Sequence, residues 1–337
     1  MSTPAPTLQP PAAGQPQYGF YDRLKAEFPS QLLVDATEIC NLACVHCPHP
    51  TFKKSQHYDG RSLNAELNAK LVDEVRDHGK GHTQYIRYAS NGEPLTHPHI
   101  YEMLEYAKRH SGVLVTLTTN GKLMGEPRIE RLLAAGVDVI DISLDAFSPE
   151  VYAKVRVGGN LSVTRANVLK LLARVREQNA STKVVVSFVE QPANRHETDL
   201  FHNFWKNAGA NYVVVRRLHS CSGAKTELAE ERRMENESTV ARRACLYPWE
   251  RIVLNARGDL SFCPSDWVHG SFISDYRTTT IKEVWQGEFY RKLRAAHLNN
   301  DYSCHGFCGQ CPDWKSTRWP DQGRSYANMM EEFKALE

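Results

Sequence analysis

Six short runs of β-branched and other apolar residues recur along the first two thirds of the chain, and segments with a helical period separate them. In those segments, apolar residues spaced by three and four positions, such as Ile100, Met103 and Leu104, form one helix face. This alternation predicts βα units and a parallel sheet. Six units in succession predict an α/β fold, a partial (β/α)6 TIM-like barrel with its functional loops after the carboxyl ends of the strands. The runs cover residues 32–36, 84–89, 113–118, 137–144, 183–188 and 212–216.

The pattern changes after about residue 220, where a charged stretch (225–243) replaces the βα alternation. A β-hairpin is expected next, with arms at 251–254 and 259–262 around a turn at 255–258. The Pro- and Ala-rich first residues are typical of a disordered tail. We therefore expect a tail and lead-in at 1–30, a barrel at 31–222, a second domain at 223–315 and a C-terminal tail or helix at 316–337.

Composition restricts the classes of partner only weakly. The net charge of +2 gives no field strong enough to indicate a nucleic acid or an anionic membrane, so we expect neither as a partner. The N-terminus lacks the basic and apolar segments of a secretory signal, and no stretch reaches the roughly 20 apolar residues of a membrane helix. We therefore expect a cytoplasmic protein with reduced thiols.

Nine cysteines are present, and in a reducing compartment closely spaced cysteines indicate metal ligands rather than disulfides. Two cysteines, Cys221 and Cys304, stand apart from the others. The other seven form two groups with ligand-like spacing: Cys40, Cys44 and Cys47, then Cys245, Cys263, Cys308 and Cys311.

The first group is a C-x3-C-x2-C loop that directly follows the first predicted strand. A [4Fe–4S] cluster usually takes four cysteine ligands, so three leave one iron open to bind a small chelating molecule. A structural zinc site is the alternative, with His46 or His49 as a further ligand.

The second group combines Cys245 and Cys263, which the hairpin brings together, with the C-x2-C pair Cys308 and Cys311. Residues Ile281, Val284 and Trp285 give a helical period between the two pairs. On spacing alone, a structural zinc held by four cysteines is a fair alternative.

The first loop and its place after a barrel strand resemble the signature of the radical S-adenosylmethionine (SAM) superfamily. The resemblance implies that the open iron binds the amino and carboxylate groups of the cosubstrate, and that an electron from the cluster cleaves its C–S bond. The run at 90–94 resembles the family's GGEP motif, with Asn91 where glycine is commoner. It implies that Glu93 and the backbone receive the cosubstrate's ammonium group, so the expected cofactor-binding residues here are Asn91, Gly92, Glu93 and Pro94.

Three further residues match family stretches: Asn120 after the third strand, Ser143 after the fourth, and Arg156. The resemblance implies that Ser143 lies near the ribose or carboxylate of the cosubstrate. Arg156 is expected to pair with that carboxylate, since a guanidinium fork bonds a carboxylate through two nitrogens. Turn, cap or surface roles are the alternatives for all three.

The second group resembles the SPASM/twitch extension of this superfamily, which carries auxiliary [4Fe–4S] clusters. A complete SPASM domain contains a C-x2-C-x5-C-x3-C run that this chain lacks, so we expect one auxiliary cluster. The shorter pattern resembles that of 2-deoxy-scyllo-inosamine dehydrogenase-like enzymes and of single-cluster epimerases. Cys304 is either an alternative ligand or a spare thiol.

These resemblances imply a radical SAM oxidoreductase that removes a hydrogen atom from a C–H bond of its substrate and so leads to oxidation of the substrate. The expected substrate is a sugar, aminocyclitol or peptide natural-product precursor. An electron donor such as flavodoxin or ferredoxin is the expected partner. One alternative is an epimerase in which Cys221, just past the sixth strand, returns a hydrogen atom. The other is a zinc-stabilised binding module without catalysis.

Overall fold

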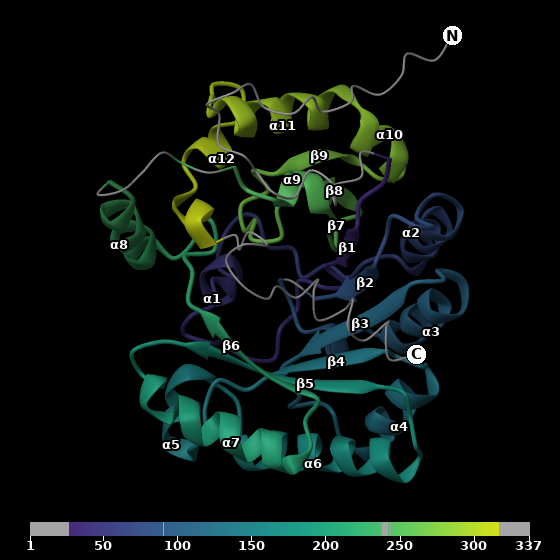
Figure 1. Cartoon of the computed structure of the whole chain (residues 1–337), viewed down its shortest axis with the longest axis vertical. Coiled ribbons are helices and arrows are strands. Elements are labelled where there is room, and N and C mark those ends of the chain that lie inside the picture. Colours follow the sequence, from purple (N-terminus) through teal and green to yellow (C-terminus); the bar gives the residue numbers. More distant parts are fainter. Residues whose placement is uncertain (1–26, 90, 238–241, 243, 317–337) are drawn as a thin grey trace.

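The computed structural model describes residues 27–89, 91–237, 242 and 244–316 of the chain (Figure 1). Most of the expected N-terminal tail (1–26) and nearly all of the expected C-terminal region (317–337) lie outside the described residues. So does Ser90, the first residue of the GGEP-like run, and so do residues 238–241 and 243 of the charged stretch.

A parallel sheet of six strands forms the centre of the fold, and each strand falls on one of the predicted runs. Neighbouring strands pair in the order β6-β5-β4-β3-β2-β1, so the chain builds the sheet one strand at a time. Within the described residues β6 pairs only with β5, which leaves an open, partial barrel. The predicted α/β fold is confirmed. The strands are β1 (Gln31–Val34), β2 (Tyr85–Tyr88), β3 (Leu114–Thr119), β4 (Val139–Ser143), β5 (Lys183–Glu190) and β6 (Tyr212–Arg217).

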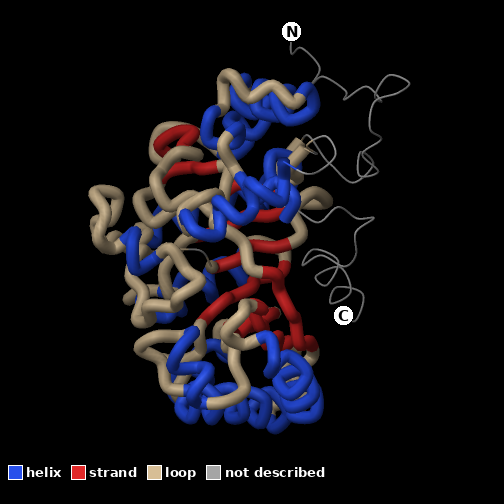
Figure 2. The backbone as a smooth tube through the Cα atoms, turned by 90° about the vertical axis from the view of Figure 1, so that its left-hand side faces the viewer, coloured by secondary structure: helices blue, strands red, loops and turns tan. Residues whose placement is uncertain are grey.

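Helices cover the outer face of this sheet (Figures 1 and 2). Several start where a polar side chain caps a free backbone N–H: Asn64 caps α2, Ser148 caps α5 and Asn160 caps α6. The helices up to the charged stretch are α1 (His49–Phe52), α2 (Ala65–His78), α3 (Ile100–His110), α4 (Glu126–Ala134), α5 (Pro149–Val155), α6 (Leu161–Glu177), α7 (Thr198–Ala208) and α8 (Thr226–Glu237), with short 3-10 turns η2 (Pro94–Thr96) and η3 (Arg195–Glu197).

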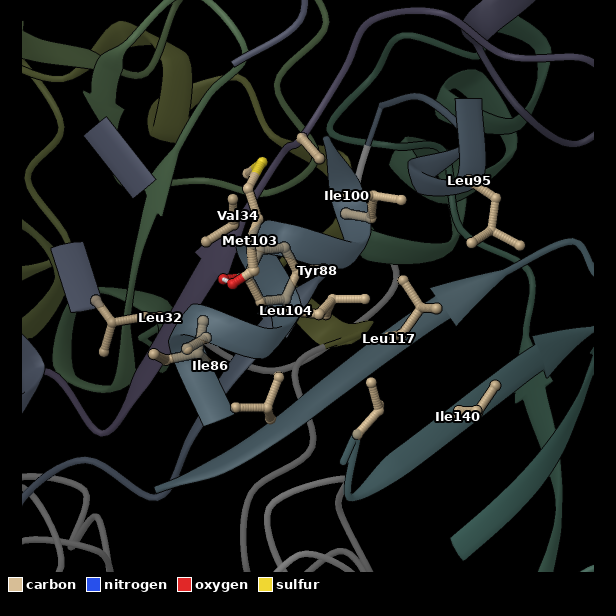
Figure 3. Packing of buried hydrophobic residues seen from close by; sticks show 14 of the residues in the cluster. Leu32, Val34, Ile86, Tyr88, Leu95, Ile100, Met103, Leu104, Leu117 and Ile140 are labelled. Atoms are coloured by element: carbon tan, nitrogen blue, oxygen red, sulfur yellow. Dashed lines mark hydrogen bonds between the residues drawn. The ribbon is translucent and has the colours of Figure 1, made fainter. Parts of the chain in front are cut away.

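The main core lies between the sheet and these helices (Figure 3). Alternate strand residues such as Leu32 and Ile86 are fully buried there against Leu104 of α3. Burying one such side chain stabilises the fold by roughly 1.5–3 kcal/mol. The intervening residues, including Tyr85 and Val139, form a second, smaller apolar cluster on the opposite face.

The C-terminal region continues the same sheet beyond β1. Strand β7 (Arg251–Leu254) pairs parallel with β1, and β8 (Asp259–Ser261) and β9 (Phe272–Asp275) add to it antiparallel. The predicted hairpin is confirmed: the Asn255 side chain accepts from two N–H groups of its turn, and Gly258 takes a left-handed φ of 87°. The remaining helices are α9 (Tyr247–Glu250), α10 (Ile281–Gln286), α11 (Glu288–Asn299), α12 (Gly306–Gly309) and the 3-10 turn η4 (Pro312–Ser316).

Within the described residues, every helix is too short or too polar to cross a lipid bilayer.

Candidate active site

The loop with the first cysteine group begins just beyond β1 and is fixed at several points. Its backbone pairs with the segment that follows α5, because Ala43 N–H donates to Val157 (2.9 Å) and Val45 N–H donates to Val155 (3.1 Å). The N–H of His49 donates to the Cys47 sulfur (3.4 Å). The loop is therefore fixed to the chain at the end of α5.

The three thiols of this loop lie close enough to affect one another. Burial raises the pKa of Cys40 to about 11, and the charge of Cys44 adds to that rise. Burial likewise raises the pKa of Cys47 to about 12, with further contributions from Cys44 and Cys40. Because iron is bound by thiolates, filling this site releases protons from thiols that are otherwise protonated.

Arg156 forms the main charged contact of the loop. Its Nε and Nη2 lie 2.8 and 2.5 Å from Oδ2 of Asp145, and its Nη1 lies 3.6 Å from the Cys44 sulfur. Burial lowers the pKa of Arg156, but Asp145 and Cys44 outweigh that effect and raise it overall. Its described partners are thus Asp145 and Cys44, and its pairing with a cosubstrate carboxylate stays a prediction.

The two histidines considered as zinc ligands have other partners. His49 Nε2 lies 2.8 Å from the carbonyl oxygen of Glu38. His46 lies 3.4 Å from Asp145, and burial lowers its pKa to about 4. Both rings therefore interact with other groups of the protein.

The GGEP-like run packs directly against the chain before the first cysteine. A Cβ atom on Gly92 would lie 2.0 Å from the carbonyl oxygen of Thr37, so only glycine fits there. The Glu93 carboxylate accepts from the Thr119 hydroxyl (2.6 Å) and the Asn120 N–H (2.8 Å), and burial raises its pKa. Pro94 is buried as the first residue of η2. The run thereby joins the ends of β2 and β3 to the cysteine loop.

The structure brings two of the remaining predicted residues to the same edge of the sheet. The Asn120 side chain donates to Asn41 inside the cysteine loop (2.7 Å). Ser143 ends β4 opposite Ser187 of β5. Asn91, by contrast, reaches the C-terminal region, because its side chain donates to the carbonyl of Asp266 (3.1 Å).

A charged layer inside the barrel was missed from the sequence. Asp141 of β4 is almost fully buried and accepts from Arg216 (2.7 Å) and Arg87 (3.3 Å), which come from β6 and β2. Ser187 donates to the same carboxylate. The available signal was a charge at an alternating position of an otherwise apolar strand, such as Asp141 between Ile140 and Ile142.

The second cysteine group is assembled from distant parts of the chain. Burial raises the pKa of Cys263, and the charges of Cys245 and Cys311 add to it. The same two neighbours raise the pKa of Cys308 after burial. The four predicted ligands therefore lie together, whereas Cys304 is exposed.

Both groups have the donor chemistry of iron–sulfur ligands, namely soft thiolates. Across residues 27–89, 91–237, 242 and 244–316, no three Cys, His, Asp or Glu side chains are gathered tightly enough to hold a single metal ion. The assignment of Cys40, Cys44 and Cys47 to one cluster and of Cys245, Cys263, Cys308 and Cys311 to the other stays a prediction.

The turn after β6 lies between the two groups. The charge of Cys47 acts on Cys221, whose pKa is raised mainly by burial. The Ser222 hydroxyl lies 3.5 Å from the Cys263 sulfur. Lys225, which follows the turn, donates to the carbonyl of Val45 in the first loop (2.8 Å). This turn therefore bridges the barrel loop and the C-terminal group.

A small cavity marks the joint between barrel and C-terminal region. It is lined by side chains from both parts, including Asp35, Asn91, Cys263, Asp266 and His269. Burial raises the pKa of Asp35 to about 8, although the N–H groups of Asn91 and Gly92 work against that rise.

Two family models match this chain. The Radical SAM superfamily model matches residues 34–192, and the SPASM model, an iron–sulfur cluster-binding domain, matches residues 245–312. These matches confirm the expected cofactors at the level of domains: a cluster and SAM in the first, and an iron–sulfur cluster in the second. The roles of individual residues stay predictions.

Among curated relatives, a probable GTP 3′,8-cyclase of Methanococcus maripaludis is 28% identical over 53% of this chain. The match covers 56% of that protein, so the chain spans about half the length of the first relatives it matches. The mycofactocin maturase MftC of Mycobacterium ulcerans is 28% identical, over 86% of this chain and 82% of its own.

Two solved structures have the same fold. SuiB of Streptococcus suis, bound to its precursor peptide SuiA, matches with a TM-score of 0.63 and 14% identity, over 93% of this chain and 75% of its own. BtrN, in complex with AdoMet and 2-DOIA, matches with a TM-score of 0.54 and 14% identity, over 84% of this chain and 92% of its own. At this identity the likeness concerns the fold alone.

Proposed function

This chain belongs to the radical SAM superfamily and carries a C-terminal SPASM domain, and from that premise we propose that it oxidises a C–H bond of a peptide or small-molecule natural-product precursor. Cys40, Cys44 and Cys47 would hold the first cluster, whose reduced form would supply the electron for cleavage of SAM and so for removal of a hydrogen atom from the substrate. The observation that carries the proposal is the segment from Ser220 to Lys225, in which the Ser222 hydroxyl lies 3.5 Å from the Cys263 sulfur and Lys225 donates to Val45 of the first cysteine loop.

Oxidation of the substrate requires an acceptor for the second electron, and the sheet brings the second cysteine group near the first. Because β7 pairs with β1, the chain between Cys245 and Cys263 passes beside the strand that leads into Cys40. Cys245, Cys263, Cys308 and Cys311 would hold an auxiliary iron–sulfur cluster, which would supply an acceptor for that electron. The chain's own task is to exclude water and to hold the substrate between the two groups.

Around the cosubstrate, we assign binding to residues of the barrel edge. The glycine at 92 lets the backbone approach the cysteine loop, and Glu93 and Asn120 connect β2 and β3 at this edge. Arg156 fixes the loop through Cys44 and adds positive charge near a carboxylate ligand. Pro94 and Asn91 keep the run in place, while Ser143 lies at the neighbouring strand end.

Peptides and small molecules are both candidate substrates. The relative MftC is named a maturase, the solved SuiB is bound to a precursor peptide, and BtrN is bound to 2-DOIA. A one-electron donor protein such as flavodoxin or ferredoxin is the proposed partner for the barrel cluster.

The experiment is an anaerobic assay of reconstituted protein with SAM, dithionite and candidate precursors, read by mass spectrometry. Oxidation lowers the product mass by about two units and consumes SAM to 5′-deoxyadenosine. Protein that binds about eight iron atoms yet never yields 5′-deoxyadenosine with any precursor would contradict the proposal.

A second candidate is epimerisation with Cys221 as hydrogen-atom donor, which the position of that thiol beside Cys47 favours. Epimerisation leaves the product mass unchanged. Cys221→Ala should abolish inversion and leave SAM cleavage intact, whereas the exposed Cys304→Ala serves as control. An unchanged yield of epimer from Cys221→Ala excludes this candidate.

A further inference from the structure

The turn after β6 has an unusual backbone. Cys221, Ser222 and Gly223 have φ values of 55°, 57° and 99°, all in the left-handed region. Two of these three residues are not glycine, so the conformation is strained. Such a turn persists only where its surroundings hold it in place.

One carboxylate holds this turn. Oδ1 of Asp313 accepts from the Ser220 N–H (2.9 Å), and its Oδ2 accepts from the Ser220 hydroxyl and the Ser222 N–H (both 2.8 Å). Asp313 lies two residues after Cys311, so the clamp joins the turn to the second cysteine group.

The clamp sets the direction of the Ser222 side chain. The Ser222 hydroxyl lies 3.5 Å from the Cys263 sulfur. A ligand thiolate carries no proton, so in the filled site the hydroxyl is the donor of the hydrogen bond to this sulfur.

We propose that Ser222 donates a hydrogen bond to the ligand sulfur of Cys263 and raises the reduction potential of the auxiliary cluster, with Asp313 as its positioning residue. A donor to a ligand sulfur stabilises the reduced, more negative cluster. A higher potential favours acceptance of the substrate's second electron. The inference rests on the proposed function, because it requires the auxiliary cluster.

The test is a redox titration of the reconstituted full chain, followed by electron paramagnetic resonance of both clusters. Ser222→Ala and Ser222→Gly should each disfavour reduction of the auxiliary cluster about tenfold, which for one electron is a shift of about 59 mV to lower potential. Glycine tolerates the left-handed backbone, so a shift common to both variants comes from the hydroxyl and not from strain. The barrel cluster should keep its potential.

A matched control is Ser303, which lies next to Cys304. The Ser303 hydroxyl lies 3.9 Å from the exposed Cys304 sulfur, outside the second group, so Ser303→Ala should leave both potentials unchanged. Asp313→Glu keeps the negative charge but displaces the carboxylate from the turn, so it should lower the auxiliary potential as Ser222→Ala does. The double variant should show no further shift, because both changes remove the same hydrogen bond.

Two results would overturn the inference. If the wild type holds two clusters and both Ser222 variants keep its auxiliary potential, the hydroxyl has no such role, and the proposed function stands. If the wild type binds only about four iron atoms per chain, the auxiliary cluster itself is absent, and the proposed oxidation fails together with this inference.

Discussion

The two cysteine groups are built in opposite ways. The barrel group comes from eight consecutive residues, Cys40 to Cys47. Its main charged contact is Arg156, which also forms a buried ion pair with Asp145. The C-terminal group is drawn from residues 245 to 311, and one of its contacts is with the neutral hydroxyl of Ser222. A local motif therefore forms the first cysteine group, whereas the pairing of distant strands assembles the second group.

Replacing one cysteine in each group tests this difference most strongly. Cys44→Ala should remove about four iron atoms and abolish formation of 5′-deoxyadenosine, because the open cluster is lost. Cys263→Ala should also lose about four iron atoms but keep dithionite-driven SAM cleavage within about tenfold of wild type. Iron analysis and product quantification measure both. Equal loss of cleavage in the two variants would show that the groups do not have separate roles.

The buried ion pair should make the barrel group the more sensitive to loss of charge. Arg156→Ala leaves the Asp145 carboxylate buried without its main partner, which costs about 3–5 kcal/mol of folding free energy. Urea unfolding of reduced, cluster-free protein measures this loss.

Arg174 offers the matched control, since it is an arginine that pairs with carboxylates, Glu130 and Glu177, but at the surface. Arg174→Ala should barely change stability, because solvent screens such pairs. A similar loss in both variants would contradict the role given to burial of Arg156.

The close approach at Gly92 predicts a smaller effect. Gly92→Ala places a methyl group against the backbone oxygen atoms of Thr37 and Ile39, which costs about 1–3 kcal/mol and displaces the cysteine loop. SAM affinity should fall about tenfold, which equals 1.4 kcal/mol. Gly125→Ala, where a Cβ meets open space, is the control. Unchanged affinity in Gly92→Ala would mean that this run does not position the cosubstrate.

Asp35, at the joint between the two regions, predicts an effect that depends on pH. Its folded pKa of about 8 lies above its ordinary value, so its contribution to stability is complete below pH 4 and is lost as pH rises through 8. Asp35→Asn should therefore gain stability relative to wild type between pH 4 and 8, and the gain should level off above that. Unfolding free energies at several pH values check this, and a constant difference would show that Asp35 does not titrate in this range.

Much of the fold could be predicted because its signals are local. Each of the six strands lies on a run of apolar residues, and the hairpin around Asn255 and Gly258 follows from its turn residues. The C-x3-C-x2-C loop could be recognised for the same reason. Asp313 and Ser222 could not, because they are 91 residues apart and neither belongs to a motif.

By itself, the sequence determined which segments become strands and helices, and which cysteines have ligand spacing, since both depend on neighbours a few residues apart. The pairing of β7 with β1, and the contacts of Ser222 with the second cysteine group and of Lys225 with the first loop, come from the tertiary structure alone. Strand pairing and the Asp313 clamp use backbone groups that every residue carries, so they leave no local signal in the sequence. They also join residues some 90 to 220 positions apart.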